Sequence, residues 1–277
     1  MMSISQLLSC IRKQADGQYI AKYANFTLRS VFQPIYKNDI SIVGLEALVR
    51  ISNANGTMVR PDQFFQSKAT PTQDLLNVER LSRLIHIKNF SQSRFHTKQL
   101  FLNVLPVAAE ILVKDITYNR LLKQTIYESH LMNEQIVMEL LELKVEDELS
   151  LSQAARELSQ GGFKLAIDDY GVNASTTERV RSVCPDIIKM DRSLLLRYEN
   201  GDFKALNDAL SLAKALCSKT AIEGIETEHQ LRLMKKLGFD MYQGYLLAIP
   251  QTLDVYEEAK TAWLCKNKSL RGLARAT

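Results

Sequence analysis

The sequence predicts an α/β barrel, and two observations predict that fold. Near the start of the chain, two strand-like segments are joined by a tight turn. From Leu100 onward, six short β-rich runs alternate with amphipathic segments of helical period, which is typical of a parallel sheet. The pair and the six runs come close to eight strands, which favours a closed barrel over an open doubly wound sheet. No GxGxxG motif follows the first strand, so a dinucleotide-binding open sheet loses its best support.

The elements are expected in the following order. A short amphipathic segment over residues 1–25 predicts a helical extension. The segments SVFQPIYK and SIVGLEALVRI, with a turn at Lys37 to Asp39, predict an antiparallel strand pair, and a helix is expected from about Asp74 to Phe90. The barrel domain is expected to cover residues 26–264, and the basic tail, residues 265–277, to be a solvated terminus. The six later strand runs are LFLNVL, IVMELLE, KLAIDDY, DIIKMD, TAIEGIE and YQGYLLAI.

Length and composition fit a soluble globular protein with a sizeable core. The chain has 277 residues, of which 46% are hydrophobic and 24% are charged, and its formal net charge is only +4. We therefore expect no direct binding to nucleic acid. No run of about 18 apolar residues and no signal peptide is found, and the four widely spaced cysteines suggest neither disulfides nor a zinc site. These features predict a cytoplasmic protein without a membrane span.

Each predicted strand carries a polar residue within the run or toward its end, where barrel enzymes place their working residues. A single acid inside an apolar strand is more often a structural carboxylate. A series of them around one barrel mouth is different, because burying so many oxygen ligands without a cation would be prohibitive. The residues are Glu46, Asn103, Glu139, Asp168 with Asp169, Lys189, Glu223 and Gln243.

Carboxylate and amide oxygens are ligands that suit Mg²⁺ or Mn²⁺ rather than Zn²⁺. The acids outnumber what one divalent ion takes from protein, so we expect two ions that clamp the attacking and leaving oxygens at a phosphorus atom. Asp168, the last strand residue, would face the mouth, and Asp169, already in the turn, would bend back to the second ion. We expect the histidines to be surface or packing residues of helices and loops; they are His86, His96, His130 and His229.

Lys189 is the one cation in this set. It is either a salt-bridge partner of Asp191 or of the acidic cluster, or a group that orients the nucleophile and offsets charge on the phosphate. From the residues alone, the sequence predicts a metal-dependent phosphoester hydrolase on an α/β barrel.

These segments resemble the EAL domain family, the bacterial cyclic di-GMP phosphodiesterases. The naming motif is Glu46-Ala47-Leu48 in GLEALVR, preceded by FQPIY from Phe32. LFLNVLP, VMELLE, AIDDYG, DIIKMD, IEGIETEHQ and YQGYLLAIP follow in order, and together the motifs cover roughly residues 26 to 255. The resemblance implies a modified TIM-type (β/α)8 barrel with one antiparallel strand, in a stand-alone EAL protein that forms a homodimer.

The resemblance also implies a role for each matched residue. The first ion would be held by Glu46, Asn103, Glu139 and Asp168, and the second by Asp168, Asp169 and Glu223. Lys189 and Gln243 would position the attacking water, Glu223 would take part in catalysis, and Glu142 would steady the loop after Asp169. Gln33, Leu48, Arg50 and Glu226 would contact the dinucleotide.

The implied reaction opens cyclic di-GMP to linear pGpG with two Mg²⁺ or Mn²⁺ ions, while Ca²⁺ inhibits turnover. Such an enzyme would lower the cyclic di-GMP signal that governs biofilm formation and motility. The main departure from the family is Val172-Asn173-Ala174, where the family usually has Thr, Gly and Tyr. This departure keeps an alternative open, in which the chain is a weak or inactive EAL module that acts as a cyclic di-GMP receptor or protein-binding regulator.

Overall fold

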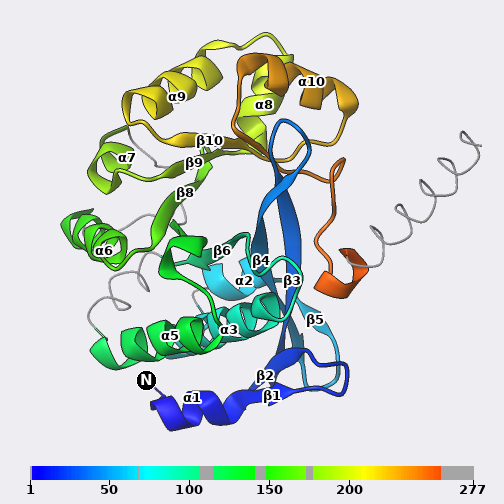
Figure 1. Cartoon of the computed structure of the whole chain (residues 1–277), viewed down its shortest axis with the longest axis vertical. Coiled ribbons are helices and arrows are strands. Elements are labelled where there is room, and N and C mark those ends of the chain that lie inside the picture. The colour runs from blue at the N-terminus through cyan, green and yellow to red at the C-terminus, as the bar shows by residue number, and fades with distance from the viewer. Residues whose placement is uncertain (1, 68, 106–114, 141–147, 173–176, 257–277) are drawn as a thin grey trace, which may run out of the picture.

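A closed barrel of eight strands lies at the centre of the molecule (Figure 1). The computed structural model describes residues 2–67, 69–105, 115–140, 148–172 and 177–256. The barrel order is β3-β11-β10-β9-β8-β7-β6-β4, and β4 closes the circle by pairing with β3. Strand β3 is antiparallel to both of its barrel neighbours, and the other neighbouring pairs are parallel. The predicted modified barrel with one antiparallel strand is therefore confirmed.

The leading strand pair forms a long hairpin that extends beyond the barrel. Its strands are joined at the predicted turn, where the Lys37 N–H donates to the Ser41 carbonyl over 2.9 Å. Three further strands extend the sheet past β3 and β4; they are β1 (Ile11–Lys13), β2 (Tyr19–Tyr23) and β5 (Met58–Val59). The barrel strands are β3 (Phe26–Tyr36), β4 (Ile42–Asn53), β6 (Gln99–Val104), β7 (Ile136–Leu140), β8 (Lys164–Tyr170), β9 (Ile187–Met190), β10 (Lys219–Ile222) and β11 (Met241–Tyr242).

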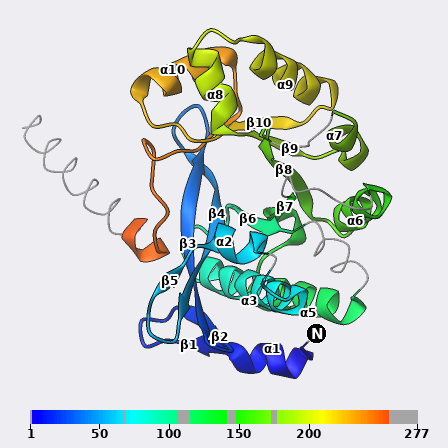
Figure 2. The ribbon, with the colours of Figure 1, turned by 180° about the vertical axis from the view of Figure 1, so that it is seen from behind.

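Helices surround the barrel, and most of them lie toward the two ends of the molecule's longest axis. Figures 1 and 2 show α1, α3 and α5 at one end and α8, α9 and α10 at the other. The predicted helix from about Asp74 to Phe90 is confirmed as α3. The helices are α1 (Ile4–Cys10), α2 (Pro61–Gln66), α3 (Thr72–Ser91), α5 (Ile116–Glu128), the 3-10 turn η1 (Asn133–Gln135), α6 (Glu148–Gln160), α7 (Thr177–Val183), α8 (Arg192–Glu199), α9 (Lys204–Ala215) and α10 (Glu228–Leu237).

The first 25 residues differ from the predicted helical extension. Only Ile4–Cys10 is helical, and β1 and β2 join the sheet, with Ala21 of β2 opposite Leu28 of β3. The side chain of Asn89 on α3 holds the start of β2, because it accepts from the Tyr19 N–H and donates to the Tyr19 carbonyl. This tertiary contact stabilises a strand too short for its alternation to be recognised in the sequence.

Two predicted strands end earlier than the apolar pattern indicates. Strand β10 ends at Ile222, and the chain turns at Gly224, which has a φ of 67°. Strand β11 ends at Tyr242, where the backbone packs against the first turn: a Cβ at Gly244 would lie 2.1 Å from the Ile225 carbonyl oxygen. Both ends are therefore set by contact between two loops at the barrel mouth, a long-range constraint that local hydrophobicity does not report.

An apolar layer fills the barrel interior below the mouth. Seven of its buried residues come from seven different strands: Ile35, Phe101, Val137, Ala166, Ile187, Ala221 and Met241. Strand β4 contributes Gly44, where a Cβ would lie 2.5 Å from the Phe101 ring. The barrel is thus closed by packed side chains beneath the mouth, as in other barrels of this type.

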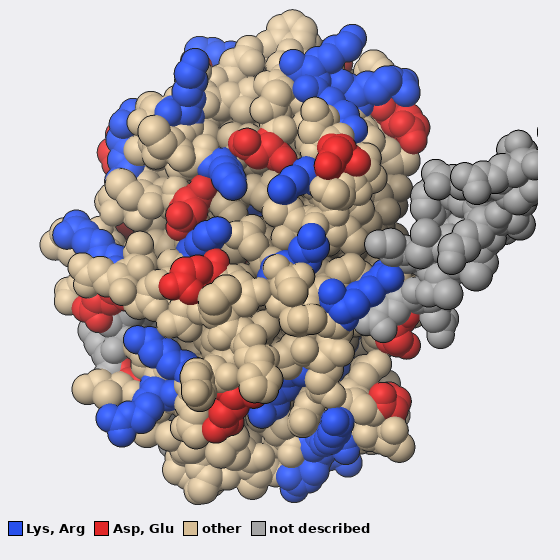
Figure 3. All heavy atoms as spheres, in the orientation of Figure 1, with Lys and Arg blue, Asp and Glu red and all other residues tan. Residues whose placement is uncertain are grey.

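Charges of both signs are interspersed on the face of the molecule shown in Figure 3. Within the part of the chain that the structure describes, no helix has the length and hydropathy needed to cross a bilayer.

His86 on α3 is a packing residue, as expected, and not a ligand. It is buried against β3, with its Nδ1 2.8 Å from the Ser30 hydroxyl. Burial lowers the pKa of His86 to about 3, with a further contribution from the charge of Arg83. The folded protein therefore holds a neutral imidazole at neutral pH.

This neutral histidine predicts a loss of stability in mild acid. Since the pKa of His86 lies below its ordinary value of 6.5 in the folded chain, the unfolded chain binds a proton that the folded chain excludes. The free energy of unfolding should therefore fall as the pH drops below 6.5. From pH 7.5 to 5.5, wild type should lose about 1.4 kcal/mol more than His86→Gln does in urea unfolding. An equal pH dependence of the two proteins would contradict this assignment.

Candidate active site at the barrel mouth

The polar residues of the barrel mouth lie directly above the apolar layer. Each barrel strand contributes one residue to the apolar layer. Because side chains alternate along a strand, the residue two positions closer to the mouth points to the same side as that layer residue. Strand β3 runs in the opposite direction, so its mouth residue precedes the layer residue in the sequence. The pairs of layer and mouth residues are Ile35 and Gln33, Gly44 and Glu46, Phe101 and Asn103, Val137 and Glu139, Ala166 and Asp168, Ile187 and Lys189, Ala221 and Glu223, and Met241 and Gln243.

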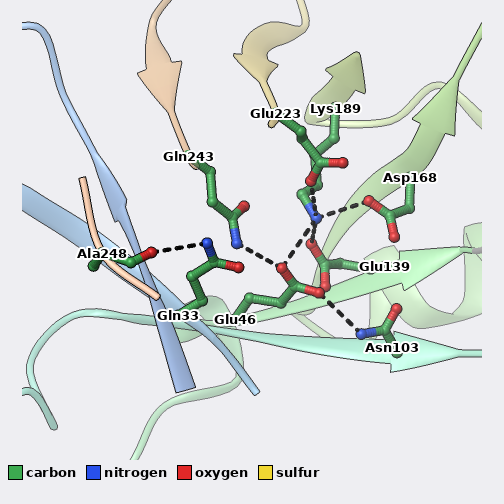
Figure 4. A network of polar contacts seen from close by, with 9 residues as sticks. All are labelled: Gln33, Glu46, Asn103, Glu139, Asp168, Lys189, Glu223, Gln243 and Ala248. Carbon is green, nitrogen blue, oxygen red and sulfur yellow. Dashed lines mark hydrogen bonds and ion pairs between the residues drawn. The ribbon is translucent and has the colours of Figure 1, made fainter. Parts of the chain in front are cut away.

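The ammonium group of Lys189 lies at the centre of the mouth (Figure 4). It points into a group of four carboxylates and is only 1% exposed. Its Nζ lies 2.6 Å from Glu223 Oε1, 2.7 Å from Glu139 Oε1 and Asp168 Oδ1, and 3.6 Å from Glu46 Oε2. Of the two predicted partners, Lys189 therefore pairs with the acidic cluster, while Asp191 accepts from the Ser193 N–H as the N-cap of α8.

Three amide side chains complete the mouth. Gln243 Nε2 donates to Glu46 Oε2 over 2.7 Å, and Asn103 Nδ2 approaches Glu46 Oε1 at 3.3 Å. Gln33 Nε2 donates to the Ala248 carbonyl over 3.0 Å. Glu46 is therefore held between two amides, so its carboxylate faces the same space as Lys189.

Burial strongly perturbs the acids of the cluster. It raises the pKa of Glu139 and of Glu223 well above the usual value, and it raises the pKa of Asp168, while the Lys189 ammonium opposes each shift. Burial and the charge of Asp168 raise the pKa of Asp169 to about 7. Burial alone would lower the pKa of Lys189, but the surrounding carboxylates raise it well above its usual value. One ammonium therefore does not fully offset the cost of burying these carboxylates in their ionised forms.

A β-bulge brings both adjacent aspartates to the mouth. Between the paired residues Ile167–Ile188 and Tyr170–Met190, strand β8 has one residue more than β9, so Asp168 and Asp169 lie opposite Lys189. Asp169 adopts a φ of 54°, which is uncommon for a residue other than glycine. Asp169 was predicted to lie in the turn; it lies in β8, and the bulge, not a turn, directs it inward.

The donor set fits divalent cations that prefer oxygen ligands. Ligand atoms of Asp168, Asp169 and Glu223 all lie within 4.8 Å of one another, which matches the set predicted for the second ion. Glu139 is fully buried, and its Oε2 has no hydrogen-bond partner among the described residues. A buried carboxylate oxygen without a partner is costly, and a bound cation would satisfy it.

A cavity of about 340 Å³ lies beside the mouth. Two of the predicted substrate contacts, Leu48 and Arg50, line it together with Asn103 and Asp169. Its outer wall includes Phe65 of α2. Burial lowers the pKa of Arg50, while Tyr245 and Glu46 oppose the shift, so this guanidinium lies close to both residues.

Glu226, a further predicted substrate contact, lies outside this group. Glu226 accepts from Arg192 over 2.5 Å in a half-exposed ion pair, and no described contact joins it to the cluster. Glu142 and the loop residues Asn173 and Ala174 fall outside the described residues. Val172, the first departure from the family pattern, is exposed.

Sequence reasoning from the strands alone missed Gln33, which only the family resemblance indicated. The alternation of side chains in FQPIY does indicate Gln33. Because β3 is antiparallel to its neighbours, however, the mouth residue comes two positions before Ile35 in the sequence and not two positions after it. The buried Glu79 and Arg83 of α3, beside the cavity, were also missed. They lie in a helix, where no strand-end rule applies.

Comparison with known proteins agrees with this arrangement. The family model of the EAL domain matches residues 21–250. The Escherichia coli (strain K12) protein named "Probable cyclic di-GMP phosphodiesterase PdeD" is 28% identical over 223 residues, which cover 76% of this chain and 39% of that protein. The chain spans 32% and 25% of the length of two more relatives from the same organism, PdeA and PdeN.

Solved structures share the barrel. A standalone versatile EAL protein from Vibrio cholerae O395, in its c-di-GMP bound form, has a TM-score of 0.72 at 23% identity, over 83% of this chain and 95% of that one. Klebsiella pneumoniae BlrP1, in its complex with manganese and cyclic di-GMP, has a TM-score of 0.70 at 22% identity, over 81% of this chain and 56% of that one. At these sequence identities, the likeness shows a shared fold and nothing further.

The position of Lys189 predicts that it is the internal counter-ion of the metal-free protein. Lys189→Met should lower the free energy of unfolding in the presence of a chelator by about 3 to 5 kcal/mol, because it leaves buried carboxylates without their cation. Mn²⁺ should then stabilise the variant more than wild type, since the added cation takes over the neutralisation. Urea unfolding with and without Mn²⁺ measures both effects.

Lys204→Met is the matched control, because it removes an exposed lysine paired with Asp208. It should leave the stability unchanged. A Lys189→Met protein as stable as wild type in chelator would contradict the role of this lysine.

Proposed function

Since the family model covers most of its length, the chain belongs to the EAL domain family, and from this premise we propose that it hydrolyses cyclic di-GMP to linear pGpG. The observation that carries the proposal is the mouth itself: every residue of the family motifs expected to hold metal or water lies on the mouth side of the barrel's apolar layer. The relatives named cyclic di-GMP phosphodiesterases support the choice of substrate.

The proposed site takes two ions, Mg²⁺ or Mn²⁺. Glu46, Asn103, Glu139 and Asp168 would hold one, and Asp168, Asp169 and Glu223 the other. When bound, such ions activate water and neutralise charge that develops on the phosphate. Ca²⁺ should permit binding but inhibit turnover, because its longer and looser coordination does not suit an in-line reaction.

The chain's own residues orient the water and offset charge. Gln243 is fixed by its bond to Glu46, and its Oε1 has no partner among the described residues, so it can accept a hydrogen bond from the attacking water. Lys189 supplies a fixed positive charge beside the reacting phosphate. Glu223, whose pKa is raised by burial, would take part in catalysis from the same mouth.

The cavity beside Arg50 supports a dinucleotide as substrate. At about 340 Å³, it is within the range of ligand pockets and suits one nucleoside of the pair. Arg50 and Leu48 would contact that half, with Phe65 as an aromatic wall. Gln33, held by the Ala248 carbonyl, and Glu226 would contact the rest of the ligand.

The proposed reaction is balanced by one water molecule. The water oxygen bonds to one phosphorus, the bond from that phosphorus to O3′ breaks, and the freed O3′ takes up a proton. The ring opens and the second phosphodiester stays intact, which gives pGpG. We place this reaction in the cytoplasm, in a homodimer, where it would lower the signal that controls biofilm formation and motility.

A cyclic di-GMP receptor or protein-binding regulator is the second candidate. The departure at Val172-Asn173-Ala174 favours it, because the altered segment begins only three residues after Asp169. A displaced Asp169 would leave the dinucleotide bound without turnover. Glu142 is proposed to steady the loop after Asp169, so it would also affect the position of that aspartate.

We expect the purified protein, with Mn²⁺ or Mg²⁺, to convert cyclic di-GMP to pGpG, and Glu46→Gln to abolish this conversion. The substitution removes a carboxylate from the proposed first ion while keeping the size of the side chain. Glu228→Gln, at an exposed residue of α10, is the matched control and should be as active as wild type. Chromatography of the nucleotides measures the product. Tight binding of cyclic di-GMP without product after long incubation would contradict the proposed enzyme activity and favour the receptor function.

A further inference from the structure

The end of strand β6, which carries Asn103, lacks a strand neighbour on one side. Pairing between β6 and β4 stops at Leu102 and Ala47, whereas pairing between β6 and β7 continues to Val104 and Leu140. The cavity of about 340 Å³ lies along the unpaired flank and is lined by both Asn103 and Leu105. Among the described residues, no strand pairs with the end of β6 on this side, although the Leu105 side chain packs against Leu76.

A buried carboxylate of helix α3 takes the place of the missing strand. The Leu105 N–H, the first backbone amide beyond β6, donates to Glu79 Oε1 over 3.0 Å. Arg83 holds the same oxygen, with Nη2 at 2.7 Å, and donates through Nη1 to the Tyr118 hydroxyl over 3.2 Å. Glu79, Arg83 and Tyr118 are all buried. The end of β6 is thus linked to a rigid network on α3 and α5.

This network is better suited to placing Leu105 than to stabilising the fold. Glu79 Oε2 and Arg83 Nε have no partner among the described residues. A buried ion pair with unsatisfied atoms is a weak stabiliser, and apolar side chains of similar size can replace such a pair at little cost. An apolar residue at position 79 alone would lose the bond to Leu105 and would also leave the buried Arg83 guanidinium without its carboxylate, which lowers stability.

We infer that Glu79 is a positioning residue, which fixes the end of β6 and thereby places the Asn103 amide for cation binding. The inference rests on the proposed function, in which Asn103 is a ligand of the first ion. Asn103 lies two residues before Leu105 and contacts Glu46 Oε1 through its Nδ2 at 3.3 Å. A shift of β6 would therefore move Asn103 away from a carboxylate of the same proposed ion. Replacing a side chain that orients a metal ligand commonly lowers metal affinity by about 10- to 100-fold.

The test compares Glu79→Leu with Glu79→Gln by calorimetric titration with Mn²⁺ in the absence of nucleotide. Glu79→Leu should weaken Mn²⁺ binding by about 10-fold or more. Glu79→Gln keeps an oxygen that can accept from the Leu105 N–H, so its affinity should stay within about threefold of wild type. Circular dichroism checks that each variant is folded at the temperature of the titration.

Arg80→Met is the control for a merely structural effect. Arg80 lies on the same helix and is buried, but it pairs with Asp115 over 2.9 Å instead of contacting β6. It should lower the melting temperature and leave Mn²⁺ affinity unchanged. The inference is overturned if Glu79→Leu binds Mn²⁺ like wild type, if Arg80→Met weakens binding equally, or if Glu79→Gln fails to restore it. A wild-type chain that binds no Mn²⁺ would instead remove the proposed function, and this inference with it.

Discussion

The interaction on which the site depends is the contact of one ammonium group with four carboxylates, three of them buried. Lys189 lies within 2.6 to 3.6 Å of acids from β4, β7, β8 and the end of β10. Without it, these acids could not share one barrel mouth in their ionised forms. Even with it, burial raises the pKa of Glu139 and Glu223, and the neighbouring carboxylates add to both shifts. Four carboxylates around one ammonium make the mouth a suitable place for divalent cations.

The barrel produces this concentration of charge through simple strand geometry. An apolar residue from each strand fills the interior, and the next residue on the same face carries a polar group. Because the apolar layer is packed, the polar groups above it stand on rigid strands or, for Glu223 and Gln243, on the first residue beyond a strand. Two departures from regular geometry complete the site: the bulge in β8 adds Asp169, and the reversed direction of β3 adds Gln33.

Much of this arrangement could be predicted from the sequence because strands alternate and because parallel strands end at one edge. Glu46, Asn103, Glu139, Asp168, Lys189, Glu223 and Gln243 were all recognised in this way. The bulge at Asp168–Asp169, the early end of β11 and the strands within residues 1–25 were not, since each depends on a distant partner: β9, Ile225 and Asn89, respectively. The support of β6 by Glu79 is of the same kind, because no periodicity relates a helix carboxylate to a strand end.

The central claim is that this mouth directs water to a phosphorus atom of cyclic di-GMP. A single-turnover reaction in oxygen-18 water, with protein in excess over cyclic di-GMP and with Mn²⁺ present, tests it most directly. Mass spectrometry should find a linear dinucleotide with one heavy oxygen in its terminal phosphate, because the water oxygen bonds to phosphorus as the bond to O3′ breaks. Recovery of intact cyclic di-GMP from the complex, or a linear product without the label, would contradict the claim.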